Sequence, residues 1–309
     1  MPRVSDRSHH NARRPVIGQR LRKADGIAKA TGKAIYADDI QLPGMLHAKI
    51  LRSPHAHAKI LSIDTSEVEA LHGVKAVLLG AEIPERYGII PWTPDEQALA
   101  TDKARFVGDG IAAVAALDEE TANLALKKFK VAWEVLDALV EPEDALARTD
   151  LLIHDENPRQ LKKGNVSKHV QLEFGDVDGE LERAEVVVDG EYFFEGTTHA
   201  PIEPHCAVAQ WEEAPFAEGQ GRLTIWSSTQ VPHYLHRELA RVLELYPAQI
   251  RAIQPSLGGA FGGKSEPFDL EFVVSKLAIK TGRPVKLLYT REEVFYSHRG
   301  RHPMLMNFT

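Results

Sequence analysis

Apolar residues alternate with polar ones, or form short runs between turn residues, along much of the first half of the chain. Both patterns predict β-strands, which we place at 45–53, 57–64, 74–80 and 105–117. A short helix is predicted over 66–73. A longer helix over 118–130 has Asp118 at its cap, acids in its first turn and lysines in its last, which suits the helix dipole.

The second half repeats the alternation of strand and helix. Strands are predicted at 183–195, 222–228, 249–255, 284–290 and 303–309. Between the first two of these lies a polar stretch, 196–212, and an acidic, glycine-containing loop. Helices are predicted over 232–245 and 266–282, the latter with Ser265 as its cap and Gly282 at its end. This order predicts an α+β fold.

Breaks in the pattern divide the chain into parts. The polar, basic start predicts a disordered tail over 1–16, followed by a first domain over 17–142. A polar segment, 143–170, is predicted to be a linker, and a second domain covers 171–309.

Composition and charge exclude several classes of protein. No run approaches the roughly 18 apolar residues of a membrane span, and the start lacks the apolar segment of an export signal. The single Cys206 cannot form an internal disulfide. The net charge of −7, without a basic stripe among aromatics, disfavours nucleic acid. A cytoplasmic protein is expected.

The chain has 14 histidines, some of them in close pairs. The pairs are His55/His57, His233/His236 and His298/His302. None comes with a second ligand pair at zinc spacing. We interpret these histidines as surface or hydrogen-bonded structural groups, so no metal ligand is predicted.

A glycine-rich stretch, 255–271, matches the pattern of a phosphate-binding P-loop, because Gly258 is followed at the required spacing by Gly263-Lys264-Ser265. A P-loop needs a strand leading directly into the turn and a helix starting at its end. Pro255 interrupts the strand, Pro267 occupies the first helical turn, and the bulky Phe261 stands in the loop. The surroundings therefore disfavour a nucleotide site.

Two interpretations of the loop remain. Its glycines permit positive φ angles and close backbone approach, so the loop could offer backbone N–H groups to an anion with Phe261 at its tip. Alternatively, it is a tight turn whose Phe261 fills the core. Residue types alone do not separate these alternatives.

Several segments resemble one known family, the large molybdenum-cofactor subunit of the xanthine dehydrogenase and aldehyde oxidase family of molybdenum hydroxylases. The matching segments, which follow the family's order and spacing, are 29–60, 102–126, 131–142, 198–211, 226–243, 258–264 and 280–303. The resemblance implies an a/b hammerhead domain followed by the first part of a molybdopterin-binding domain.

The resemblance also implies which residues contact the cofactor. Gln230, in the motif "SSTQ", is the position that donates a hydrogen bond to an oxygen on molybdenum. The backbone of Gly259, Ala260, Phe261 and Gly262 approaches the molybdopterin. Pterin sulfurs hold the metal in this family, so no protein ligand is implied.

Other candidate residues are interpreted as structural. Glu203, in "IEPH", is expected to be a locally paired carboxylate at a strand end. His205 and Arg237 are likewise expected to be structural and not catalytic. In purine-oxidising members a glutamate follows "GGK" directly, whereas this chain has Ser265 before Glu266. That departure disfavours a purine substrate.

Within the family, the segments 87–103, 262–271 and 291–306 resemble the α subunit of 4-hydroxybenzoyl-CoA reductase. This resemblance implies reductive dehydroxylation of an aromatic CoA thioester in the breakdown of aromatic compounds. The alternatives are a hydroxylase of another aromatic or aldehyde substrate, and a non-catalytic remnant.

The family's catalytic glutamate lies downstream of the part that this chain matches. We therefore expect no catalytic residue in this chain and no turnover by the chain alone. The site would be completed by a second molybdopterin-domain chain or by a missing C-terminal part. A dinucleotide form of the cofactor, an iron–sulfur subunit and an FAD subunit are also implied.

Overall fold

The computed structural model describes residues 18–88, 94–156, 163–214, 221–297 and 299–309. The chain divides into a small unit, Met1–Ile35, and a main unit, Tyr36–Thr309. The small unit contains the short helix α2 (Gly26–Ala30). The disordered tail predicted over 1–16 lies outside the described residues.

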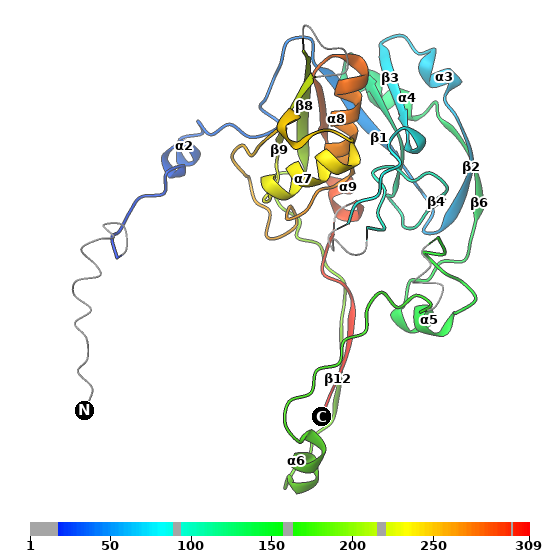
Figure 1. Cartoon of the computed structure of the whole chain (residues 1–309), viewed down its shortest axis with the longest axis vertical. Coiled ribbons are helices and arrows are strands. Elements are labelled where there is room, and N and C mark those ends of the chain that lie inside the picture. The colour runs from blue at the N-terminus through cyan, green and yellow to red at the C-terminus, as the bar shows by residue number, and fades with distance from the viewer. Residues whose placement is uncertain (1–17, 89–93, 157–162, 215–220, 298) are drawn as a thin grey trace. The chain divides into compact units, whose positions relative to one another are not determined.

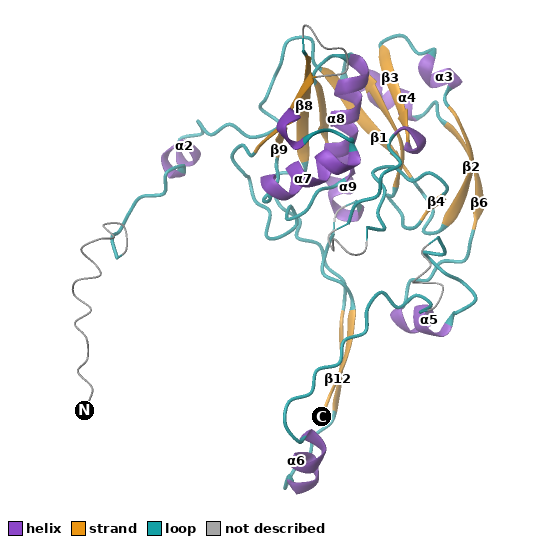
Figure 2. Cartoon of the chain, viewed as in Figure 1, coloured by secondary structure: helices purple, strands orange, loops and turns teal. Residues whose placement is uncertain are grey.

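The main unit is built on a seven-stranded sheet (Figures 1 and 2). Its strands are Leu46–Arg52 (β1), Val74–Leu79 (β3), Gly110–Ala116 (β5), Cys206–Glu213 (β8), Gly221–Ser227 (β9), Ile250–Ile253 (β10) and Val285–Leu288 (β11). Their spatial order is β10-β9-β8-β11-β1-β5-β3. The strands predicted in these regions are confirmed. β8 was not predicted, because most of it falls in the stretch 196–212 that we interpreted as polar.

The first and second halves of the chain meet inside this sheet. β1 pairs with β11 in parallel, with Leu46 opposite Val285, and pairs with β5 on its other side. The antiparallel pairing of β11 with β8 continues the sheet into the second half. One continuous sheet therefore holds both halves of the main unit.

Both faces of the sheet are covered, as the seven consecutive buried residues of β5 require. Ala113 and Ala115 pack in the larger core cluster together with α8 (Asp269–Thr281). Val114 and Ala116 face the opposite cluster, beneath α4 (Glu119–Leu126). Figure 1 shows α8 lying across the sheet.

Helix α8 begins at Asp269, four residues after the cap that we predicted at Ser265. Pro267 precedes an extended Phe268, whose backbone N–H donates to the Glu271 carboxylate at 2.9 Å. That hydrogen bond satisfies one of the free N–H groups at the helix start. Gly282, at φ 62°, ends the helix as predicted.

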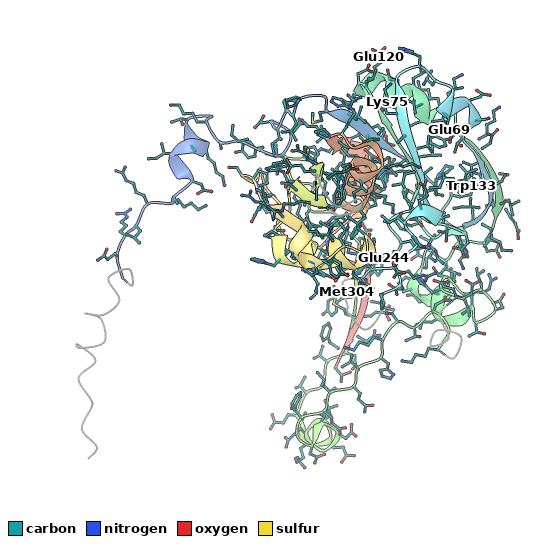
Figure 3. The ribbon with its side chains drawn as sticks, turned by 45° about the horizontal axis from the view of Figure 1, so that its top comes forward. Glu69, Lys75, Glu120, Trp133, Glu244 and Met304 are labelled. Atoms are coloured by element: carbon teal, nitrogen blue, oxygen red, sulfur yellow. The ribbon has the colours of Figure 1, made fainter. Side chains whose placement is uncertain are left out.

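The main unit also contains a second, smaller sheet and several short helices. The smaller sheet has the order β4-β2-β6, and β6 carries Trp133, labelled in Figure 3. The bounds are Ala58–Asp64 (β2), Lys103–Ala104 (β4), Lys130–Val135 (β6), Ser66–Glu69 (α3), Pro142–Ala147 (α5), Val177–Arg183 (α6), Pro232–Val242 (α7) and Arg291–Tyr296 (α9). Short 3-10 turns are Gly80–Glu82 and Pro247–Gln249. α9 was not predicted; Thr290 caps it through the Glu293 N–H.

A two-stranded ribbon, β7 (Gly190–Phe194) with β12 (Met304–Phe308), pairs antiparallel apart from the large sheet. Figure 3 labels Met304 at its start. The strand predicted over 183–195 was too long, because only its last part pairs. Five large apolar residues of the ribbon are each more than 40% exposed: Tyr192, Phe193, Met304, Leu305 and Phe308. Two strands alone are marginally stable in water.

Candidate functional site

The glycine loop, defined as Gly258–Lys264, has an unusual backbone. Gly259 and Gly262 have φ angles of 109° and 93°, and Phe261 is held at φ 56° although it is not glycine. Such a conformation costs a bulky residue on the order of 1–3 kcal/mol. Phe261 is also 75% exposed. The alternative in which Phe261 fills the core is therefore wrong.

The loop presents four consecutive backbone N–H groups. Those of Gly259, Ala260, Phe261 and Gly262 have no hydrogen-bond acceptor among the described residues. Within the loop, the Gly263 N–H donates to the Ala260 carbonyl at 2.8 Å. The Ser265 N–H donates to the Gly262 carbonyl. Successive unpaired N–H groups in a turn with left-handed residues form a concavity that binds anions or other oxygen acceptors.

Gln230 lies beside the loop, shortly after the end of β9. Its backbone N–H donates to the Lys264 carbonyl at 2.7 Å, and its side-chain Oε1 accepts the Lys264 N–H at 3.3 Å. Because Oε1 is occupied in this way, the exposed side chain is left with its Nε2 group as a hydrogen-bond donor. The structure thus brings Gln230 next to the loop, and both offer donors.

Lys264 does not face a ligand. Its side chain is 1% exposed, and Nζ lies 2.7 Å from Glu203 Oε2 and 3.4 Å from the Pro204 carbonyl. Burial lowers the pKa of this lysine, while the neighbouring carboxylate opposes the shift. A P-loop lysine must reach the phosphates, so this geometry argues against nucleotide binding here.

Glu203 holds the first end of the loop. Its Oε2 accepts the Gly258 N–H at 2.9 Å in addition to the lysine, and its own N–H donates to the Gly258 carbonyl at 3.3 Å. The other oxygen, Oε1, is buried and has no hydrogen-bond partner within the described part of the chain. The expectation of a local pair at a strand end was wrong, because the partner comes from the glycine loop.

His205 holds the second end of the loop. Its Nε2 lies 3.0 Å from the Gly263 carbonyl, and its ring packs edge-on against Phe268. Arg291 fixes the preceding segment by donating to the carbonyls of Pro201 and Ile202 at 2.7 and 2.6 Å. Residues 201–205 therefore bind both ends of the glycine loop. No sequence pattern signalled this contact.

Arg237 keeps the structural role that we expected. It bonds Glu238 on its own helix, and its guanidinium lies 4.5 Å from the centre of the Tyr234 ring. Its side chain is 60% exposed. It makes none of these contacts with the glycine loop.

A cavity of about 540 Å³ lies between the first-half segment 95–109 and residues 268–302. Arg299 borders it and bonds both Glu96 and Glu266. Burial raises the pKa of Glu266 to about 7, against the lowering effect of Arg299. Neither Gln230 nor the exposed part of the glycine loop lines this cavity.

Asp109, at the wall of the cavity, is predicted to make stability depend on pH. Burial raises its pKa from 3.8 to about 7, although the Arg105 N–H donates to Oδ2 at 3.0 Å. Between these values the folded chain keeps a proton that the unfolded chain has lost, so stability should fall as the pH rises through the window. Asp109→Asn stays neutral and should flatten this slope, measured by urea unfolding across that pH range.

Burial also raises the pKa values of Glu266 and Glu271 to about 7, so a smaller slope should remain in Asp109→Asn. A conservative change at an exposed carboxylate, Asp150→Asn, serves as the control. If Asp109→Asn and the unchanged protein show the same slope, Asp109 is not the group that titrates.

Among the described residues, no group of three or more His, Cys, Asp or Glu side chains is placed to hold a metal ion. Burial raises the pKa of the Cys206 thiol to about 12, which keeps it protonated. Within the same residues, no helix is both long and apolar enough to cross a bilayer.

Two family models match the chain in consecutive order. Residues 31–137 match the aldehyde oxidase and xanthine dehydrogenase a/b hammerhead domain. Residues 153–309 match the molybdopterin cofactor-binding domain. The predicted fold, a hammerhead domain followed by part of a molybdopterin-binding domain, is confirmed.

Known proteins show the same relationship. The chain is 37% identical over 295 residues to the nicotinate dehydrogenase large molybdopterin subunit of Eubacterium barkeri, covering 94% of this chain and 65% of that protein. It is 34% identical over 297 residues to the xanthine dehydrogenase molybdenum-binding subunit of Escherichia coli, covering 91% and 37%. The chain thus spans between about a third and two thirds of the length of these relatives.

Solved structures agree with the sequence comparison. Quinoline 2-oxidoreductase from Pseudomonas putida 86 superposes with a TM-score of 0.80 at 29% identity, covering 94% of this chain and 37% of that one. Aldehyde oxidoreductase from Desulfovibrio gigas gives 0.80 at 28% identity, covering 94% and 32%. The chain belongs to the xanthine dehydrogenase and aldehyde oxidase family and carries sequence of its large molybdopterin subunit.

Proposed function

We propose that this chain forms one wall of the molybdenum cofactor site of a molybdenum hydroxylase. The observation that supports the proposal is the set of hydrogen-bond donors in and beside the glycine loop. Four backbone N–H groups lack acceptors among the described residues, and Gln230 adds the Nε2 donor beside them. A cofactor rich in oxygen acceptors fits this set, and no protein ligand to the metal is required.

The bound cofactor would supply the two-electron redox chemistry of hydroxylation, or of dehydroxylation in the reverse direction. The chain's own part is to hold and orient. The N–H groups of Gly259–Gly262 would position the pterin, and Gln230 would donate to an oxygen carried by the metal. Donors fixed before the reaction stabilise developing charge without reorganising, as in an oxyanion hole.

We propose that a second molybdopterin-domain chain, or further sequence of the same protein, completes the site. The exposed apolar residues of the β7–β12 ribbon support this, since a two-stranded ribbon gains stability from additional strands. The greater length of the relatives also supports it. The general acid or base would come from that partner. No residue of this chain is assigned a proton-transfer role.

The remaining parts of the proposal rest on the family resemblance and the sequence. They are a dinucleotide form of the cofactor, electron transfer through iron–sulfur and FAD subunits, and a cytoplasmic location. Several relatives are named as subunits of larger enzymes, such as the 6-hydroxypseudooxynicotine dehydrogenase complex subunit gamma of Paenarthrobacter nicotinovorans.

Two classes of substrate fit the proposed site. The names of nicotinate dehydrogenase and quinoline 2-oxidoreductase favour hydroxylation of a nitrogen-containing aromatic ring. Our interpretation that segments 87–103, 262–271 and 291–306 resemble 4-hydroxybenzoyl-CoA reductase favours an aromatic CoA thioester. An aromatic substrate is common to both, and the direction of electron flow separates them.

The test is to purify the complex from its native host through a tag on this chain. Molybdenum and pterin are expected in equal amounts. A folded complex that contains neither would contradict the proposal and favour a non-catalytic remnant. The loaded complex is then assayed with nicotinate and an oxidising dye, and with 4-hydroxybenzoyl-CoA and a low-potential reductant. Turnover in one assay alone identifies the substrate class.

A further inference from the structure

We propose that Glu203 is a positioning residue that sets the glycine loop in the conformation that receives the cofactor. This inference rests on the proposed function, because it concerns the same loop. Glu203 would act through the Gly258 N–H, which it accepts at 2.9 Å, and would not touch the cofactor itself.

Glu203 and Gly258 are packed too closely for a side chain at position 258. A Cβ on residue 258 would lie 2.7 Å from the Cβ of Glu203, which no real pair of atoms tolerates. Backbone and side chain of Glu203 both bond Gly258, on its carbonyl and its N–H. Gly259, directly after Gly258, has a φ of 109°. Glu203 therefore binds the chain where the left-handed turn begins.

Lys264 makes the carboxylate compatible with this position. A buried carboxylate is costly unless it is paired, and an uncompensated negative charge behind the N–H groups would repel an electron-rich ligand. Lys264 Nζ lies 2.7 Å from Glu203 Oε2 and is itself buried. Lys264, the lysine of the P-loop pattern, thus neutralises the Glu203 carboxylate.

A contribution to stability alone does not explain the Glu203–Lys264 ion pair. The Oε1 atom of Glu203 is buried without a partner in the described residues, which is rare and calls for an explanation. Stability alone would favour two apolar side chains at these sites, because replacing a buried ion pair in this way is often neutral or stabilising. Loop geometry supplies a reason to retain the pair.

The test compares two double variants in the complex purified from the native host. Glu203→Gln with Lys264→Met removes both charges but keeps an amide oxygen to accept the Gly258 N–H. Glu203→Leu with Lys264→Met removes the acceptor as well. We expect both to melt close together. The first should retain molybdenum and pterin, and the second should lose at least about tenfold of each per chain, as for other supporting groups around a metal site.

Equal cofactor content in the two double variants, or content that only follows the melting temperature, would overturn the inference. If either fails to fold, Glu203→Asp gives the answer: it keeps the charge for Lys264 but withdraws the carboxylate from Gly258, and full cofactor content would contradict us. A wild-type complex without molybdenum is a different result, because it removes the proposed function and this inference with it.

Discussion

Replacing Gln230 by alanine is expected to lower kcat of the molybdenum-loaded complex by about 10²–10³-fold, the usual cost of losing one preorganised donor. The side chain is exposed, and its one hydrogen bond to the described part of the protein joins Oε1 to the Lys264 N–H. Loss of that bond changes the free energy of unfolding by only about 1 kcal/mol. Steady-state kinetics with either substrate class measures the effect.

Gln230→Glu separates the donor from the acceptor. A carboxylate can still accept the Lys264 N–H, but it has no N–H to donate, so turnover should fall as far as in the alanine variant. Gln210→Ala is the negative control, because within the described residues the Gln210 side chain bonds only Glu212, on its own strand. Wild-type turnover in Gln230→Glu would remove Gln230 from the site.

Replacing Arg52 by methionine is expected to destabilise the fold by about 3–5 kcal/mol, which is typical of breaking a buried ion pair from one side. The Arg52 side chain is 7% exposed and lies 2.7 Å from Asp269 and 2.8 Å from Glu293. Its guanidinium also lies over the Tyr289 ring. Without the arginine, two carboxylates stay buried where β1 meets α8 and α9. Denaturant unfolding measures the loss.

Arg148→Met is the matched control. Arg148 also pairs with two carboxylates, Asp150 and Asp137, but all three side chains are at least 42% exposed. Solvent screens such pairs, and their removal is expected to leave the unfolding midpoint unchanged. Similar shifts in both variants would mean that burial does not set the strength of the Arg52 cluster.

The sequence predicted most of the fold because its strands and helices have strong local patterns. The helix end at Gly282 and the cap at Asp118 are examples, both found in the structure. β8 was missed because its apolar run "CAVAQW" follows directly on the prolines of "APIEPH". The start of α8 was misplaced since the hydrogen bond from Phe268 to Glu271 outweighs the general preference for a serine cap.

The site was only partly predictable. The glycine pattern indicates a turn with free N–H groups, but the direction in which Phe261 and Lys264 point depends on packing that no local pattern encodes. The Glu203–Lys264 contact joins residues 61 positions apart. Glu203 was therefore taken for a strand-end carboxylate. The choice of Gln230 as a site residue came from the family resemblance, because a glutamine in a loop has no distinctive physical signature. Its hydrogen bonds to Lys264, at the end of the loop, were not predicted.

The parallel pairing of β1 with β11 has a consequence for synthesis of the protein. β1 leaves the ribosome early and finds β5 soon after, but its other edge pairs with β11, from nearly the opposite end of the chain. At about 5–20 residues per second, that edge waits on the order of half a minute. During translation it offers unpaired N–H and C=O groups to any neighbouring nascent chain. Polysomes are thus where this sheet is most exposed to misassembly, and where a chaperone has the most to protect.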